Sequence, residues 1–291
     1  MSFNYTGTGV ALVTPFKADG AVDFDSLAKL IDHVIGGGVE YLVVLGTTGE
    51  TATLNKEEKK EIYAFVKKQN AGRAGMVAGI GGNDTRELLQ TIEAFDIDGY
   101  DALLSVSPYY NKPNQEGIYL HYKAVAEKSP LPVLVYNVPG RTGSNITAQT
   151  ALRLAALPNI KANKEASGNF EQCMDIIGQK PEGFHVVSGD DAFTLPFLSM
   201  GMSGVISVVA NAYPRQFSDM VRAGLAGDFA TAKKLHYRLY ELMKLIFADG
   251  SPGGIKCILK EMGICGDTVR LPLANVSKAV EEKLLAEAAK I

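Results

Sequence analysis

The chain has 291 residues, of which 46% are hydrophobic and 21% are charged, which is typical of a globular enzyme with a large core. Its net charge of -3 offers no basic surface for nucleic acid or an anionic membrane. The apolar runs are too short to cross a bilayer, and residues 1–5 show no signal-peptide pattern. Cys173, Cys257 and Cys265 are odd in number and lack CxxC spacing, so we expect reduced thiols and a cytoplasmic location.

Short apolar runs alternate with helical patterns along the whole chain. Eight of these runs are candidate strands, at residues 9–13, 41–45, 76–79, 102–106, 133–136, 160–164, 185–188 and 204–208. They are short, continuously apolar and rich in β-branched residues, as expected of strands that are buried on both faces. The pattern therefore predicts a parallel sheet that is covered by helices.

The segments between the candidate strands carry helix signals. Asp23 can cap a helix that the three glycines at residues 36–38 bring to an end. Asn55 and Glu58 have the spacing of a capping box, and Asn114 can begin a later helix. Each of these helices would lie between two consecutive strands.

Eight strand–helix units within about 225 residues favour a (β/α)8 TIM barrel over a doubly wound sheet. We expect residues 1–226 to form this catalytic barrel. Residues 227–291 read as a C-terminal helical extension that packs on it. Asp228 can cap a first helix there, residues 250–254 break it, and two more helical patterns follow without a low-complexity linker.

In a barrel of this type, the side chains that follow the strands gather at one end and carry the chemistry. After the second strand, the turn at residues 46–50 (Gly-Thr-Thr-Gly-Glu) could bind a small carboxylate through its backbone N–H groups. The alternative is a tight turn whose threonines cap the next helix. The fifth strand ends at Tyr136 with Arg141 beyond it, and the sixth strand ends at Lys164.

A lysine, a tyrosine, a threonine and an arginine at successive strand ends indicate a pyruvate-type Schiff-base site. Free lysine has a pKa of about 10.4, and partial burial would lower that pKa and raise the nucleophilic fraction of Lys164. Tyr136 is placed to give and take protons, and Thr47 could bridge two phenols into a relay. Arg141 offers a bidentate fork to the carboxylate of a second substrate. The simpler alternatives are a solvent-facing lysine, a core tyrosine and an arginine in a surface ion pair.

Other classes of function fit the sequence less well. A metal-dependent aldolase is disfavoured because the four histidines are scattered, and Asp190-Asp191 reads as a helix-capping turn rather than a Mg²⁺ site. No cofactor is expected, since the glycine-rich residues 79–83 lack a P-loop lysine and dinucleotide spacing. A catalytically dead sensor of a keto acid or amino acid stays open, although the intact set of site residues argues against it.

The same residues resemble a known family. The motifs that carry the resemblance span most of the chain, at residues 46–50 (GTTGE), 109–113 (YYNKP), 136–143 (YNVPGRTG), 164–168 (KEASG), 204–207 (GVIS) and 270–272 (RLP). They are similar to the dihydrodipicolinate synthases, in the class I, pyruvate-dependent aldolase superfamily that includes N-acetylneuraminate lyase. Two features favour the synthase over the lyases, which usually have serine in place of Thr47 and lack the arginine found here at Arg141.

The resemblance implies a lyase that condenses pyruvate with L-aspartate 4-semialdehyde to 4-hydroxy-tetrahydrodipicolinate in lysine and diaminopimelate biosynthesis. Lys164 would form the Schiff base and Tyr136 would donate and accept protons. Thr47 would link Tyr136 to Tyr110, which the family takes from a neighbouring subunit, so a homo-oligomer is implied, commonly a dimer of dimers. The implied substrate-binding residues are Thr48, the backbone of Ile206, Gly189 and Arg141.

The resemblance also implies a candidate allosteric site. Family members that lysine inhibits bind it at a subunit interface matching Thr51, Ala52, Asn83, Glu87 and Tyr109, often with histidines at the positions of Lys56 and Lys59. Both positions are lysines here. A fixed ammonium group about 4 Å from an incoming one costs about 4 kcal/mol at an effective dielectric constant near 20. We therefore expect weak or absent feedback inhibition by lysine.

Overall fold

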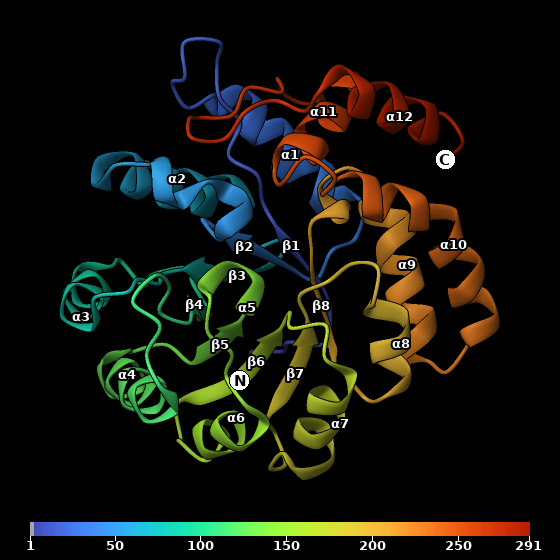
Figure 1. Cartoon of the computed structure of the whole chain (residues 1–291). Helices are drawn as coiled ribbons and strands as arrows, with labels where there is room; N and C mark the ends of the chain where they lie inside the picture. The colour runs from blue at the N-terminus through green and yellow to red at the C-terminus, as the bar shows by residue number, and fades with distance from the viewer. Residues whose placement is uncertain (1–2) are drawn as a thin grey trace.

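The computed structural model describes residues 3–291 and contains a closed barrel of eight parallel strands in the order β1 to β8 (Figure 1). The strands are β1 (Gly7–Ala11), β2 (Tyr41–Val44), β3 (Gly75–Gly79), β4 (Ala102–Val106), β5 (Val133–Asn137), β6 (Ile160–Glu165), β7 (His185–Ser188) and β8 (Gly204–Ser207). The predicted (β/α)8 TIM barrel is confirmed, and each predicted strand end lies within two residues of the observed one.

The largest displacement is at β1, which begins two residues earlier than predicted. Residues 7–10 pair with residues 204–207 of β8, and this pairing closes the barrel. The barrel interior explains Gly9, the second glycine of that strand. A Cβ atom on Gly9 would lie 2.1 Å from a ring carbon of Tyr41, so the large ring of β2 fills the space that the glycine leaves.

Helices connect the strands and cover the outside of the barrel. They are α1 (Phe24–Gly36), α2 (Lys56–Asn70), α3 (Thr85–Ala94), α4 (Gln115–Lys128), the short α5 (Pro139–Thr142), α6 (Ala148–Ala155), α7 (Phe170–Gln179), α8 (Thr194–Ser199) and α9 (Pro214–Leu225). The predicted caps are observed. Asp23 and Asn114 each accept a backbone N–H, and Asn55 and Glu58 form both hydrogen bonds of a capping box.

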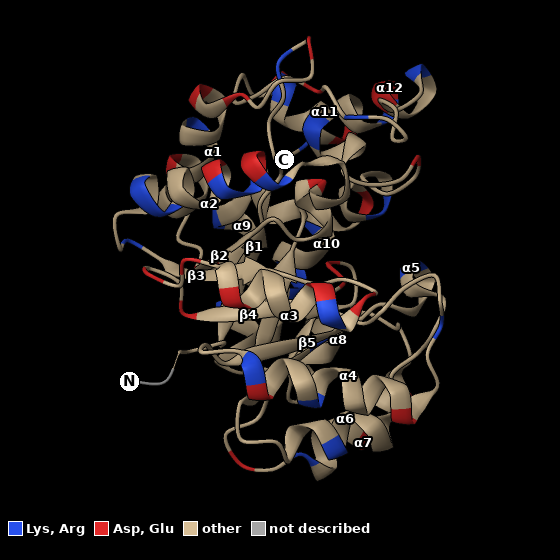
Figure 2. Ribbon diagram, turned by 90° about the vertical axis from the view of Figure 1, so that its left-hand side faces the viewer, with Lys and Arg blue, Asp and Glu red and all other residues tan. Residues whose placement is uncertain are grey.

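Three further helices follow, α10 (Phe229–Leu245), α11 (Gly253–Glu261) and α12 (Lys278–Ala288). Asp228 caps α10, as predicted, by accepting the N–H of Thr231. Helix α10 packs on α9, and α12 packs on both α10 and α11, at the end of the molecule where α1 lies (Figures 1 and 2). The division into a barrel (residues 1–226) and an extension (residues 227–291) stays a prediction, and it falls in the turn between α9 and α10.

Basic and acidic residues are interspersed over the helices in the view of Figure 2, in keeping with the small net charge. None of the helices within residues 3–291 is long and apolar enough to cross a membrane. The three cysteines are buried and free of disulfide bonds. Met1 and Ser2, which begin the segment without a signal-peptide pattern, lie outside the described residues.

Candidate active site

Lys164 and Tyr136 lie side by side at the carboxyl ends of β6 and β5. The two residues pair in register across these strands, and both side chains are buried, with exposed fractions of 6% and 7%. The Lys164 Nζ atom lies 4.2 Å from the centre of the Tyr136 ring. The alternative of a solvent-facing lysine is therefore wrong for this chain, and an amine and a phenol meet at the end of the barrel where TIM-barrel chemistry takes place.

Burial sets the charge of the lysine. It lowers the pKa of Lys164 from the ordinary 10.5 to about 7, because the ammonium form loses its hydration. The negative charge of Asp191 raises the Lys164 pKa in part, and the positive charge of Arg141 lowers it further. Near neutral pH a large fraction of this amine is thus neutral and able to attack a carbonyl carbon.

Tyr136 keeps its proton over the same pH range. Burial raises the pKa of its phenol to about 12, and the Arg141 charge and a hydrogen bond with Thr47 offset part of that rise. A neutral phenol that is hydrogen-bonded to a hydroxyl can pass a proton on and take one back. The structure therefore brings together four of the predicted residues: Lys164, Tyr136, Thr47 and Arg141.

The turn after β2 consists of two short 3₁₀ helices, η1 (Thr47–Gly49) and η2 (Thr51–Thr53). Thr48 is buried, whereas Thr47 is exposed at the mouth of the barrel. Neither 3₁₀ helix has a side-chain cap, and α2 is capped by Asn55 instead. The alternative in which the threonines cap the next helix is therefore wrong, and their hydroxyl groups are left for other partners.

Gly189 follows the end of β7, and Ile206 belongs to the neighbouring strand β8. A Cβ atom on Gly189 would lie 3.0 Å from Lys164 Cε and 2.7 Å from the Cβ of Ala166, so this position admits only glycine while the lysine keeps its place. The Gly189 N–H donates to the backbone oxygen of Glu165 at 2.8 Å. Ile206 is 1% exposed on β8. Gly189 thus directly follows β7, the strand next to β6, and Ile206 lies on β8, the strand next to β7.

Asp191 is a residue of this region that sequence reasoning assigned wrongly. Its Oδ2 accepts the N–H groups of Val208 and Val209, at 3.1 and 2.8 Å, at the start of η3 (Val209–Asn211) after β8. Burial raises the pKa of its carboxyl to about 6. The predicted capping of the following helix is wrong, because α8 has no side-chain cap, and the Asp190 carboxylate accepts the N–H of Phe193, which precedes the helix. Because Val208 lies 17 residues further on, no local pattern reveals its partnership with Asp191.

Arg141 lies on the short helix α5, at the rim of the site. Its side chain is exposed, and it makes no ion pair within residues 3–291, so the alternative of a surface ion pair is not observed. Its positive charge nevertheless lowers the pKa of both Lys164 and Tyr136. A guanidinium group at this place can take a carboxylate that enters from solvent.

Tyr110 does not join the site of its own chain. Its side chain is 88% exposed and its backbone has a φ of 74°, a strained conformation for a residue other than glycine. The loop that carries it is tied down on each side, because Asn83 Nδ2 donates to the Tyr109 oxygen and Asn111 Nδ2 donates to the Asn83 oxygen. A large aromatic side chain is therefore held out into solvent.

The candidate allosteric residues lie on neighbouring loops and helices. Asn83 and Tyr109 are in contact, as the hydrogen bond at 3.0 Å shows. Burial lowers the pKa of the Lys59 ammonium, Glu87 raises it in part and Lys56 lowers it, so these three charges are near one another. Thr51 and Ala52 belong to η2, which precedes α2.

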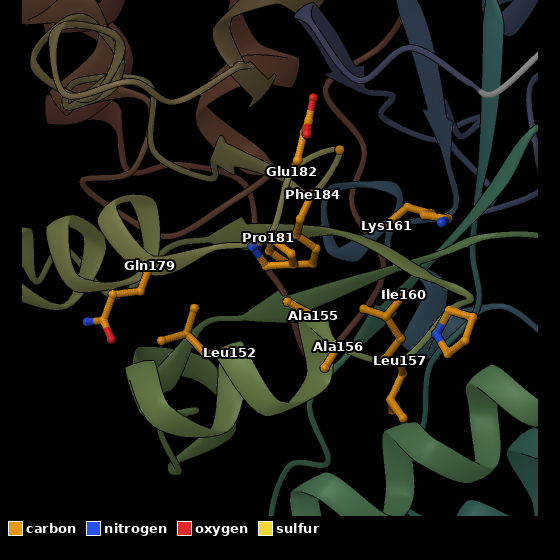
Figure 3. A pocket seen from close by; sticks show the side chains of 12 residues that line it. Leu152, Ala155, Ala156, Leu157, Ile160, Lys161, Gln179, Pro181, Glu182 and Phe184 are labelled. Carbon is orange, nitrogen blue, oxygen red and sulfur yellow. The ribbon is translucent and has the colours of Figure 1, made fainter.

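A hollow of about 370 Å³ lies away from these residues (Figure 3). It is lined by the loops that lead into β6 and β7, including Pro158, Pro181 and Phe184, so it opens at the amino ends of the strands. That end of a TIM barrel serves stability rather than chemistry. Within residues 3–291, no group of three or more histidine, cysteine or acidic side chains is placed to hold a metal ion.

Residues 4–291 match the model of the dihydrodipicolinate synthetase family. The chain belongs to this family. It is 51% identical to the 4-hydroxy-tetrahydrodipicolinate synthase of Parabacteroides distasonis over 282 residues. This alignment covers 97% of this chain and 95% of the relative. The dihydrodipicolinate synthase structure from Aquifex aeolicus is 41% identical, with a TM-score of 0.94 over 98% of each chain.

A solved monomeric dihydrodipicolinate synthase variant is also similar, at 36% identity and a TM-score of 0.95 over 99% of this chain and 98% of that one. The resemblance inferred from the sequence motifs is thereby confirmed, and so is the reading of the chain as an enzyme of the class I aldolase type. A metal-dependent aldolase and a catalytically dead sensor are not favoured by relatives that carry a synthase name.

Proposed function

We propose that the chain condenses pyruvate with L-aspartate 4-semialdehyde to give 4-hydroxy-tetrahydrodipicolinate, in lysine and diaminopimelate biosynthesis. The observation that carries this function is the buried Lys164 amine, which lies against Tyr136 and has a pKa of about 7. The names of the relatives support the choice of reaction. Amine, phenol and hydroxyl groups supply all the proton transfers, so the proposal needs no cofactor.

In this mechanism the lone pair of Lys164 Nζ forms a bond to the keto carbon of pyruvate. The oxygen takes up protons and leaves as water, which gives the imine. Loss of a proton from the methyl group then gives an enamine, whose carbon attacks the aldehyde carbon of the second substrate. Finally the amino group of that substrate adds to the imine carbon, closes the ring and releases Lys164. Tyr136 gives and takes the protons, with Thr47 as its hydrogen-bond partner.

The remaining predicted residues bind the substrates in this proposal. Thr48 and the turn around it bind the carboxylate of pyruvate, together with the backbone at Ile206. Gly189 leaves room beside Lys164 Cε for the reacting carbon. Arg141 at the rim receives the carboxylate of the semialdehyde.

The proposed active form is a homo-oligomer, a dimer of dimers, in the cytoplasm. The exposed Tyr110 supports an oligomer, because a neighbouring subunit could take this ring into its own site next to Thr47. One of the similar structures is a monomeric dihydrodipicolinate synthase variant, and the molar mass of this chain in solution tests the proposed oligomer. The free cysteines suit a reducing compartment.

We also predict that lysine inhibits this chain weakly or not at all. Lys59 is half-buried, and the Lys56 charge already lowers its pKa. The ammonium group of an incoming lysine would be a third positive charge there, which is unfavourable. A titration of the initial rate with lysine checks this prediction. Half-inhibition at sub-millimolar lysine would contradict it.

The proposed reaction is tested by NADPH consumption with pyruvate, L-aspartate 4-semialdehyde and added dihydrodipicolinate reductase, with Lys164→Ala as the control. Turnover that disappears in the control supports both the reaction and its nucleophile. If there is no turnover but borohydride still traps pyruvate on Lys164, another pyruvate-dependent aldolase, such as an N-acetylneuraminate or sugar-acid lyase, replaces the proposal. If there is no adduct, the imine mechanism fails.

A further inference from the structure

The turn that carries Thr47 and Thr48 has an unusual backbone. It is bounded by two residues with positive φ that are not glycine, Leu45 at 58° and Glu50 at 54°. Residues of this kind persist in the left-handed region only where their surroundings hold them there. The Glu50 N–H donates to the Thr47 oxygen at 3.1 Å, so the conformation of Glu50 also determines the shape of η1.

The Glu50 side chain contacts residues of the C-terminal extension. Its Oε1 lies 2.5 Å from Lys256 Nζ on α11, and both side chains are fully buried, at 0% exposure. Its Oε2 accepts the N–H of Arg270 at 2.9 Å. Lys256 also donates to the Thr268 oxygen at 2.8 Å. Both oxygens of the carboxylate are thus bound by residues more than 200 positions further along the chain.

The surroundings of this pair make the connection rigid. The Phe16 ring contacts both cations, with Lys256 Nζ at 4.3 Å and Arg270 Cζ at 4.4 Å from its centre. Arg270 also donates to the Thr53 oxygen at the end of η2 and to the Glu58 carboxylate on α2. Residues of the extension therefore bind Glu50, between η1 and η2, and also Thr53 and Glu58, at and beyond the end of η2.

We infer that Lys256 is a positioning residue of the active site: through Glu50, the C-terminal extension holds the Thr47–Thr48 turn in the shape that binds the pyruvate carboxylate. This inference rests on the proposed function, in which pyruvate binds at that turn. An exposed salt bridge would give no such role, but loss of Lys256 from this fully buried pair leaves the Glu50 carboxylate without its partner, and Glu50 belongs to the turn. The extension is then part of the binding site, although none of its side chains needs to touch the substrate.

The test compares Lys256→Met with Lys260→Met, which removes the same charge one turn later on α11 and breaks only the exposed pair with Asp267. The concentration of pyruvate that gives half-maximal borohydride trapping, and the KM for each substrate, are measured for both variants and for the unaltered chain. Lys256→Met should raise the pyruvate values about 10-fold or more, as the loss of supporting contacts behind bound groups does. The KM of Lys256→Met for the semialdehyde should stay within about 2-fold of that of the unaltered chain. All the values measured for Lys260→Met should stay within the same range.

A variant without charges separates positioning from folding. Glu50→Gln combined with Lys256→Met removes the unpaired buried charge, and its amide oxygen can still accept the Arg270 N–H. This double variant should fold with a thermal midpoint closer to that of the unaltered chain than Lys256→Met, yet keep the raised pyruvate KM. If the double variant recovers both its stability and the pyruvate KM of the unaltered chain, the inference is overturned, because the pair would then serve folding alone.

The outcomes for the two proposals differ. If the unaltered chain traps no pyruvate, the proposed function fails, and the inference fails with it. If the unaltered chain and Lys256→Met trap pyruvate with equal half-saturation, only the positioning role is overturned. Trapping that weakens in Lys256→Met and in the double variant, but not in Lys260→Met, supports both.

Discussion

Lys164 is the residue whose charge decides whether the proposed chemistry can begin. The amine must be neutral to attack a keto group, and its pKa is about 7. The protonated form therefore dominates below about pH 7, and kcat/KM for pyruvate should rise with pH up to this value and then level off. A pH profile of kcat/KM checks this expectation. A single rising limb centred near pH 10 would show that the lysine is not desolvated.

Substitution of two charged neighbours of Lys164 should move the rising part of this pH profile in opposite directions. Asp191 raises the Lys164 pKa and Arg141 lowers it. Asp191→Asn should therefore shift the limb to lower pH, and Arg141→Met should shift it to higher pH. The rate at which pyruvate forms its adduct, measured from pH 5.5 to about 9, reports the limb without the second substrate. Shifts in the same direction would mean that general disturbance, not charge, is responsible.

The lowered pKa of Lys164 also has a cost in stability. The unfolded chain has the ordinary lysine pKa of 10.5 and the folded chain a value of about 7, so the folded chain binds fewer protons between these values and its stability rises with pH there. Below pH 7 both states are protonated and the full cost remains. Lys164→Met should therefore stabilise the chain by about 1 to 3 kcal/mol at pH 6.5, and by less at pH 9.

Thermal midpoints at the two pH values measure this gain. Lys161→Met is the matched control, because Lys161 lies on the same strand with its side chain exposed. A control variant that gains as much stability as Lys164→Met would show that added hydrophobic surface, not the removal of a buried charge, is the cause.

At the scale of the elements, β6 is fixed from outside the barrel by a buried carboxylate. Glu165 is 1% exposed, and it accepts hydrogen bonds from the amides of Asn137, Asn163 and Gln172 and from the Ser167 N–H. Since neighbouring residues of a strand face opposite sides, this network holds the strand while Lys164 faces the site. It joins β5, β6 and α7 by side-chain contacts.

Loss of this carboxylate would leave several buried donors without an acceptor. Glu165→Ala should therefore lower the free energy of unfolding by about 3 kcal/mol, measured from the midpoint of urea denaturation. Glu171→Ala, which removes an exposed carboxylate from the first turn of α7, is the control and should change stability by less than about 0.5 kcal/mol. Equal effects of the two substitutions would argue against the network.

The elements themselves could be predicted from the sequence because their signals are local. The caps at Asp23 and Asn55 and the apolar runs of the strands each need only a short window. The same holds for Lys164 and Tyr136, which are placed by the ends of their own strands. The partners of Asp191 and Glu50 could not be predicted, since the pairing of β7 with β8 and the docking of α11 bring them together from 18 and 206 residues away.

At the scale of the whole molecule, the site of one chain is incomplete in the proposed mechanism. Tyr136 and Thr47 are in place, but the Tyr110 ring of the same chain is 88% exposed. A ring from a second copy would extend the hydrogen-bond relay that Thr47 begins and would lose its contact with water on assembly. Activity is therefore expected to depend on protein concentration wherever the subunits dissociate.

The exchange of Tyr110 between subunits predicts that two inactive variants restore each other. Lys164→Ala lacks the nucleophile, and Tyr110→Phe lacks the hydroxyl that is supplied to the neighbour. In a mixed dimer, one site combines Lys164 of the Tyr110→Phe subunit with Tyr110 of the Lys164→Ala subunit, so it is complete. Refolding the two variants together in equal amounts should give a mixture with about a quarter of the original activity, because half of the dimers are then mixed and each of these holds one complete site of two. Activity no greater than the mean of the separate variants would mean that each subunit uses its own Tyr110, or none.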